Sequence, residues 1–345
     1  MHSQTTSRSA VFNSLALGLL SFTGCAQRDE VALEKSGDSS VAAATDTNLA
    51  TTEQAQPFRI HAERISSPDV QLIRPQVPGF EQLTLKEKTL VYYLYKAALS
   101  GRDIFYDQLD AHGLTIRKTL ENMYATYRGD RSTEEWKAFE SYCGHFWFYS
   151  GNHFKDSNDK FAPKCTPEYF EHVARNSDPT KFPLRDGESP EELFHRIRPL
   201  VFDLTVSPKL NDLAAEDVVR GSSVNFYGNV SQQEVVAYYQ HITTDNQIPY
   251  GLSSKLVKEA DGSIRELVYK ADGMYGAAIS EMTMWLEKAI TVAENPQQAL
   301  ALEKLIVCLR SGDPKDFNEY CIAWVNDKSS KIDLILGFIE NYRDP

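Results

Sequence analysis

The chain has 345 residues, enough for two average domains or one large domain with an appendage, and 42% of them are hydrophobic. These values are typical of a globular protein with a substantial core. Lys and Arg total 36 against 48 Asp and Glu, which gives a net charge of -12. Because nucleic-acid-binding proteins usually carry a basic patch or stripe, this balance argues against a nucleic-acid partner.

The first 25 residues have the order of a secretory signal. A polar start that carries Arg8 is followed by an apolar run, Val11 to Phe22, which is too short to span a bilayer as a helix. Small residues and Cys25 come next, and a cysteine directly after Gly24 resembles the signal of a bacterial lipoprotein. We therefore expect a lipidated Cys25 and an exported, membrane-anchored lipoprotein of the bacterial envelope, in the periplasm or at the cell surface. The alternatives are a generic secretory signal and an uncleaved N-terminal tail.

The next segment, residues 26–57, is rich in Ala, Ser, Thr, Asp and Glu. It contains no aromatic residue, so it has little apolar area to bury. We expect a disordered tether here, followed by a folded domain over residues 58–345.

The folded part opens with strong helix signals. Thr84 and Glu87 form a predicted capping box, and Gly101 stands where that helix should end. Pairs of the same kind, or a cap followed by proline, predict further helix starts at Ser132–Glu135, Thr166–Pro167, Ser189–Glu192, Ser231–Glu234 and Asn295–Pro296.

One β-hairpin is predicted in the middle of the chain. Apolar and polar residues alternate over 252–258 and 263–270, on both sides of an Asp261–Gly262 turn. A short aromatic stretch over 222–230 is also β-prone, and no parallel βαβ rhythm is visible. The expected class is α+β, mostly helical with a small antiparallel sheet or barrel.

The last residues predict a further helix. Apolar side chains over 331–342 follow the spacing of one helix face, and others fall off that face, so this helix would be apolar nearly all round. Such a helix is normally covered on several sides, and Pro345 would end it and lead the chain onward. We therefore expect the partners of this helix to lie beyond residue 345.

A group of cysteines and histidines could form a zinc site. Cys143, His145, His153 and Cys165 are zinc ligand types, but their spacing matches no compact zinc motif. In an exported protein Cys143 and Cys165 could instead form a disulfide, or the stretch could be a structural loop rich in aromatic residues. The sequence leaves these alternatives open, and no metal ligand is assigned.

A second cysteine pair, Cys308 and Cys321, flanks a predicted turn between two helices. A disulfide and two buried thiols are both compatible with this arrangement. No His-Glu-x-x-His motif, Ser-His-Asp arrangement or phosphate-binding glycine loop is present, so the residues alone assign no catalytic group.

Several long stretches resemble one family in the same order along the chain. They are "VPGFEQLTLKEKTLVYYLYKAALSGRDIFYDQ", "SSVNFYGNVSQQEVVAYY", "YGLSSKLVKEADG", "AAISEMTMWLEKAITVAENPQQALALEKLI" and "AWVNDKSSKIDLILGFIENYRDP". Together they cover most of residues 77–345 and resemble the dipeptidyl peptidase III zinc exopeptidases, in particular their bacterial members.

This resemblance implies a two-lobed metallopeptidase fold, of which the chain would supply the N-terminal, lower lobe. Complete members release dipeptides from peptide N-termini and use a zinc ion bound by a His-Glu-x-x-Gly-His type hexapeptide and a second motif. Both motifs follow the Tyr-Arg-Asp-Pro stretch that ends at Pro345, and neither occurs here. The resemblance therefore implies peptide substrates, a missing C-terminal lobe that holds the zinc, and no activity for this chain alone. The alternative is a surface-anchored module that binds peptides without cutting them.

The resemblance also implies one substrate-binding residue. Family members place a carboxylate shortly before the Gly-Phe-Ile-Glu stretch, where it helps to hold the free amino terminus of the peptide. Asp333 occupies the matching position, with a shorter side chain than the glutamate of eukaryotic members. The alternative, which the sequence leaves open, is that Asp333 is an ordinary solvated helix residue. Eukaryotic members place a catalytic tyrosine two residues later, but Ile335 stands there, so that role does not carry over.

Overall fold

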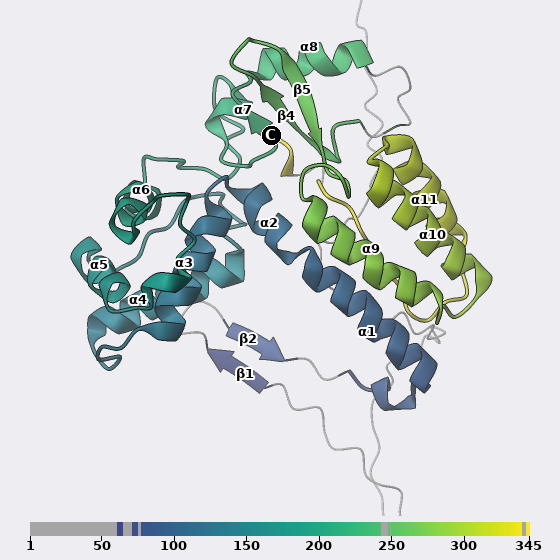
Figure 1. Ribbon diagram of the computed structural model, residues 1–345, viewed down its shortest axis with the longest axis horizontal. Coiled ribbons are helices and arrows are strands. Elements are labelled where there is room, and N and C mark those ends of the chain that lie inside the picture. Colours follow the sequence, from purple (N-terminus) through teal and green to yellow (C-terminus); the bar gives the residue numbers. More distant parts are fainter. Residues whose placement is uncertain (1–60, 65–70, 75–76, 243–247, 249, 340–342) are drawn as a thin grey trace, which may run out of the picture.

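The computed structural model describes residues 61–64, 71–74, 77–242, 248, 250–339 and 343–345 (Figure 1). The expected signal with Cys25 and the tether over 26–57 lie outside the described residues. The helices are α1 (Leu85–Ser100), α2 (Arg102–Leu109), α3 (Gly113–Thr126), α4 (Glu134–Tyr149), α5 (Pro167–Arg175), α6 (Pro190–Phe202), α7 (Val218–Gly221), α8 (Gln232–Ile242), α9 (Gly276–Ile290), α10 (Pro296–Ser311) and α11 (Pro314–Asn326), with short 3₁₀ turns at Phe80–Gln82 and Pro179–Lys181. The strands are β1 (His61–Arg64), β2 (Gln71–Arg74), β3 (Tyr227–Gly228), β4 (Ser254–Lys258) and β5 (Ile264–Val268).

The expected α+β class is confirmed. Strands β4 and β5 form the predicted hairpin, and Gly262 in its turn has a φ of 87°, which glycine adopts without strain. Strand β3 runs parallel to β4, so the sheet is mixed and not purely antiparallel as expected. Helix α8 makes the crossover that parallel strands require. The two residues of β3 are too few to show a periodic signal, which explains why the parallel pair was missed.

Most predicted helix starts are confirmed because caps depend on neighbouring residues only. The confirmed caps are Thr84, Thr166, Ser189 and Asn295. The predicted start at Ser132 is displaced by one residue: Thr133 caps α4 and accepts a bond from the backbone N–H of Trp136. Ser132 bonds instead to Asp130, which closes the preceding turn.

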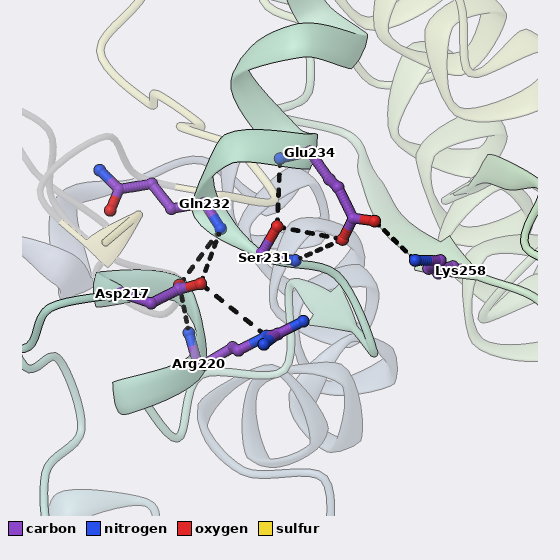
Figure 2. A network of polar contacts seen from close by, with 6 residues as sticks. All are labelled: Asp217, Arg220, Ser231, Gln232, Glu234 and Lys258. Carbon is purple, nitrogen blue, oxygen red and sulfur yellow. Dashed lines mark hydrogen bonds and ion pairs between the residues drawn. The ribbon is translucent and has the colours of Figure 1, made fainter.

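The predicted start of α8 also forms, within a wider polar network that Figure 2 shows. The backbone N–H of Ser231 donates to Glu234 at 2.9 Å, and that of Glu234 donates to the Ser231 hydroxyl at 3.3 Å. Glu234 pairs with Lys258 of β4 at 2.6 Å, and Asp217 beside α7 accepts from the backbone N–H of Gln232. The network therefore joins α7, α8 and the sheet.

The apolar side chains form two large clusters. One lies among α1, α9, α10 and α11, and the other among α3, α4, α5 and α6. Figure 1 shows these two groups of helices on opposite sides of the molecule, with α2 between them and the mixed sheet beside α7 and α8. Among the described residues, no helix combines the length and the apolar character needed to cross a membrane.

The prediction of a helix over 331–342 is wrong for residues 331–339, the part that the structure describes. Residues 331–339 have no helical turn and run as an irregular, extended segment. Ile332 and Ile339 are nonetheless buried in the cluster of α1, α9, α10 and α11. Further contacts with this cluster come from Leu334, Leu336 and Phe338. The apolar pattern thus reports burial, and helices of this same chain provide much of the cover that was expected from beyond residue 345.

Candidate functional site

The segment over 331–339, here called the extended segment, is held in place by side chains of neighbouring elements. Glu294, just before α10, accepts the backbone N–H of Ile332 at 2.8 Å, and Gln298 of α10 donates to the Ile332 carbonyl oxygen at 2.7 Å. At the other end the backbone N–H of Ile339 donates to the Leu252 carbonyl oxygen at 3.2 Å. These bonds to other elements replace the internal bonds of a helix, which explains the extended backbone.

Asp333, the residue implicated by resemblance, lies near the start of this segment and is half-buried. Its Oδ1 atom accepts from the indole N–H of Trp324 at 2.7 Å and from the backbone N–H of Leu334 at 2.7 Å. No contact to Oδ2 is found among the described residues. One oxygen therefore fixes the carboxylate, and the other can accept a hydrogen bond from a ligand.

A small cavity of about 20 Å³ lies against Asp333. Its lining includes Gln298, Tyr320, Trp324, Asp327 and Asp333. The other lining residues are aliphatic: Leu94, Ala301, Leu302, Ile332 and Leu334. No described lining residue is basic, so two carboxylates give this cavity a negative character.

The second carboxylate, Asp327, is already committed to local structure. It accepts from the backbone N–H of Ser329 at 3.2 Å and from the hydroxyl of Ser330. Burial opposes ionisation of Asp327, but these hydrogen bonds outweigh it and hold the pKa of the carboxyl below its usual range. Asp327 is therefore ionised and adds a negative field, while Asp333 presents the oxygen available for contact.

The arrangement fits a small cation with hydrogen-bond donors. A cavity of about 20 Å³ has room for a group the size of water or ammonium, and not for a peptide side chain. An ammonium that donates to a partly desolvated carboxylate gains about 1.5–3 kcal/mol. The size and charge of this cavity would suit a primary amine, with the rest of the ligand outside the cavity.

The structure does not support a zinc site formed by Cys143, His145, His153 and Cys165. Among the described residues, no three His, Cys, Asp or Glu side chains gather in a way that could hold a metal ion. His153 is buried, with Nε2 lying 2.8 Å from the Ser207 carbonyl oxygen. His145 has its Nδ1 2.9 Å from the Ser141 carbonyl oxygen. Both imidazoles therefore contact the backbone of their own surroundings.

Of the alternatives left open for the cysteines, the structure has free thiols, of which Cys143, Cys165 and Cys308 are buried and Cys321 is half-buried. Cys143 and Cys165 are buried free thiols in the cluster of α3 to α6, and burial raises the pKa of Cys165 to about 12. Cys308 and Cys321, on the paired helices α10 and α11, are also free thiols. Burial raises the pKa of Cys308 to about 12, so this thiol stays protonated at neutral pH and is a poor nucleophile.

The sequence did not point to Trp324 or Gln298 as parts of the site. Both lie on helix faces whose pattern is that of ordinary core helices, α11 and α10. Only the fold shows that the indole N–H meets Asp333 and that the Gln298 amide holds the segment that carries it.

Comparison with known proteins adds a family relationship. A family model described as peptidase family M49 matches residues 230–345, a range that contains Gln298, Trp324, Asp327 and Asp333. Dipeptidyl peptidase 3 of Homo sapiens is 22% identical over 312 residues, which cover 77% of this chain and 41% of the human protein. The Dictyostelium discoideum protein of the same name is 22% identical over 291 residues, with 77% and 40% covered.

Among solved structures, DPP III from Caldithrix abyssi matches with a TM-score of 0.45 and 17% identity, over 73% of this chain and 35% of that chain. The present chain spans about two fifths of the length of the curated relatives it matches.

Proposed function

Because this chain belongs to peptidase family M49, the dipeptidyl peptidase III family, we propose that it takes part in releasing dipeptides from the amino termini of peptides. The described residues have the role of holding the substrate. The observation that carries this proposal is the cavity at Asp333, where one carboxylate oxygen is fixed by Trp324 and the other is available.

In the proposed complex the peptide's N-terminal ammonium donates to Oδ2 of Asp333. Trp324 keeps the carboxylate oriented, and the ionised Asp327 strengthens the negative field around the ammonium. Gln298 and Glu294 act indirectly, because they position the extended segment that carries Asp333. An acetylated N-terminus has neither the charge nor the donors that the site would recognise.

Zinc belongs to the proposed chemistry of the complete family member and not to the described residues. These residues do not fit a zinc ion, since no suitable group of ligands gathers among them. No step of bond cleavage is therefore assigned to them. We expect this chain alone to release no dipeptide from a dipeptidyl-arylamide, with or without added zinc, and metal-dependent turnover by the purified chain would contradict that expectation.

The binding role is tested with an isosteric change, Asp333→Asn. Calorimetric titration should show that the wild-type chain binds a free tetrapeptide about 10- to 150-fold more tightly than its N-acetylated form, which corresponds to about 1.5–3 kcal/mol. Asp333→Asn should remove most of this preference. The matched control is Asp272→Asn, an exposed carboxylate that pairs with Lys270 and does not line the cavity. Equal binding of the free and acetylated peptides by the wild type would refute the assignment.

A further inference from the structure

Residues 203–210, here called the joining segment, connect the two groups of helices that Figure 1 shows on opposite sides of the molecule. The segment follows α6, whose Val201 lies in the cluster of α3 to α6. It ends at Leu210, which lies in the cluster of α1, α9, α10 and α11. Residues 203–210 contain no helix, so the position of the segment depends on bonds from other parts of the chain.

Two buried side chains hold the joining segment by its carbonyl oxygens. Nε2 of His153, which is 3% exposed, lies 2.8 Å from the carbonyl oxygen of Ser207. Lys160, which is 7% exposed, donates from Nζ to the carbonyl oxygens of Asp203 at 2.8 Å and Val206 at 2.7 Å. Because a carbonyl oxygen can only accept, Nε2 of His153 carries a hydrogen, and Nδ1 is the nitrogen that would take a second proton.

Backbone bonds place these two side chains next to each other. His153 and Lys160 are directly opposite one another in an antiparallel bridge, so their side chains lie on the same side. The backbone N–H of Lys160 donates to the Pro208 carbonyl oxygen at 3.0 Å, and that of Leu210 donates to the Asn158 carbonyl oxygen at 2.8 Å. The joining segment is therefore tied by its backbone as well to the loop that follows α4.

The joining segment also contains a strained residue. Ser207 has a φ of 51°, a left-handed conformation that costs free energy for a residue with a β-carbon. Surrounding bonds must hold such a residue in place, and the carbonyl group of Ser207 is the one that His153 contacts. If this contact weakened, Ser207 could relax to an ordinary conformation.

The charges around His153 determine how it responds to acid. A proton on Nδ1 would place two positive charges side by side in a buried place, because Lys160 lies directly opposite. Like charges in such positions destabilise the pair. Asp110, which follows α2, favours the charged form of both side chains, and Asp203 favours the charged form of Lys160.

Burial is the largest influence on His153, and it disfavours a charge on the ring. The bond to the Ser207 carbonyl oxygen and the charge of Asp110 oppose this effect without cancelling it, so the pKa of His153 lies below its ordinary value of 6.5. Two further contacts at this place add no net charge. Asp159 pairs with Lys209 at 2.5 Å, and the hydroxyl 3.4 Å from Nε2, that of residue 223, is neutral.

We propose that His153 is an acid-sensitive latch on the joining segment. Above pH 6.5 the neutral imidazole and Lys160 hold the carbonyl oxygens of the segment. Below this pH a proton binds more readily once the segment has opened and water reaches the ring, so acid shifts the equilibrium toward the open form. Opening loosens the connection between the two groups of helices while each cluster stays packed. The latch involves neither Asp333 nor its cavity, so this proposal and the proposed function can fail separately.

The test follows hydrogen exchange of the full chain by mass spectrometry at about pH 7.5 and pH 5.5, corrected for the intrinsic effect of pH on exchange. The reporters are the peptides that carry the backbone N–H groups of Lys160 and Leu210. Opening that is linked to one proton increases by at most about tenfold per pH unit, so protection of these reporters should fall about three- to tenfold at the lower pH. Peptides from α9 and α10 should keep their protection.

His153→Gln separates the latch from other titrating groups. The Gln amide can donate to the Ser207 carbonyl oxygen as Nε2 of His153 does, but it takes no second proton. Protection of the reporters in this variant should be equal at the two pH values. The matched control is His195→Gln, which replaces an exposed histidine of α6 and should keep the pH dependence of the wild type. Far-ultraviolet circular dichroism should show the same helix content in all three proteins.

A nuclear magnetic resonance titration of His153 in the wild-type chain needs no variant, and it should give a pKa below 6.5. Four results would overturn the proposal. They are a pKa of 6.5 or more for His153, equal protection of the wild-type reporters at both pH values, a fall in His153→Gln as large as in the wild type, and a fall of the same size throughout α9 and α10. The last result would mean that acid unfolds the whole domain and does not open the joining segment.

Discussion

Trp324 decides how Asp333 is presented, because its indole N–H is the donor from another element that fixes the carboxylate. A bond from a neutral donor to a charged acceptor contributes about 1.5–3 kcal/mol, and part of this serves to orient the side chain. The geometry of one residue at the site is thus set by another residue nine positions earlier, on α11.

We predict that Trp324→Phe keeps the packing of α11 but leaves Asp333 free to rotate. Affinity for a free tetrapeptide should fall about three- to tenfold, less than in Asp333→Asn, since the charge remains. The N-acetylated peptide should bind as weakly as before. Titration calorimetry measures both affinities. If the two peptides lost affinity equally, Trp324 would have a general structural role and no role in positioning Asp333.

Among single residues, the resemblance pointed to Asp333 but not to its partners. Asp333 was proposed because a short stretch of the chain resembles a family motif, and motifs are local in sequence. Trp324 and Gln298 act through contacts with a segment whose path depends on the fold, and no spacing pattern reports such contacts. For the same reason the burial of Cys143 and Cys165 was undecided until the packing of α3 to α6 was known.

For the helices, short sequence patterns correctly predicted the starts that depend on hydrogen bonds between neighbouring residues. Thr84, Ser189 and Ser231 cap their helices as expected, because each cap needs only a residue three positions away. The extended segment shows the opposite case. Its apolar spacing agrees with a helix, yet bonds from Glu294 and Gln298 hold it extended, so tertiary contacts override the periodic pattern.

The ion pair between Glu87 and Lys331 fastens the extended segment to α1 and should make stability depend on pH. The hydrogen bond from Lys331 and those from Thr84 lower the pKa of Glu87 to about 2 from 4.5. Because the pKa in the folded state is depressed, this stabilisation is complete above pH 4.5 and is lost as the pH falls toward 2. Thermal melts between these values should show a steeper loss of Tm for the wild type than for Glu87→Gln.

The control for this change is Glu303→Gln, which replaces an exposed glutamate of α10. Its melts should keep the pH dependence of the wild type. If Glu87→Gln and Glu303→Gln behaved alike over this pH range, the ion pair between Glu87 and Lys331 would contribute no measurable stability. This is a common result for ion pairs that solvent reaches.

For the molecule as a whole, the sequence predicted the α+β class and the family, because both depend on features spread over many residues. It did not predict the parallel β3–β4 pair or the division of the core into two large clusters. These depend on contacts between segments that are distant in the chain, which a periodic pattern cannot reveal.

We propose that the protein is exported and anchored, because its first 25 residues have the order of polar, apolar and small residues that is typical of a lipoprotein signal. We predict that cells fed a labelled fatty acid incorporate the label into the wild-type protein and not into Cys25→Ser. The membrane fraction should contain the wild type, and the variant should be depleted from it. Equal labelling of both proteins would rule out acylation at Cys25.

The bond between Glu87 and Lys331 joins residues 244 positions apart, and the same core cluster contains Leu90 and Ile339. During translation at about 5–20 residues per second, α1 would therefore wait about 12–50 s for the segment that completes its cover. In that interval its inner apolar face is available to chaperones and proteases. Proteases should consequently cleave ribosome-bound chains that stop before Lys331 within α1 much faster than they cleave the released protein. The order of synthesis therefore determines when this core becomes protected.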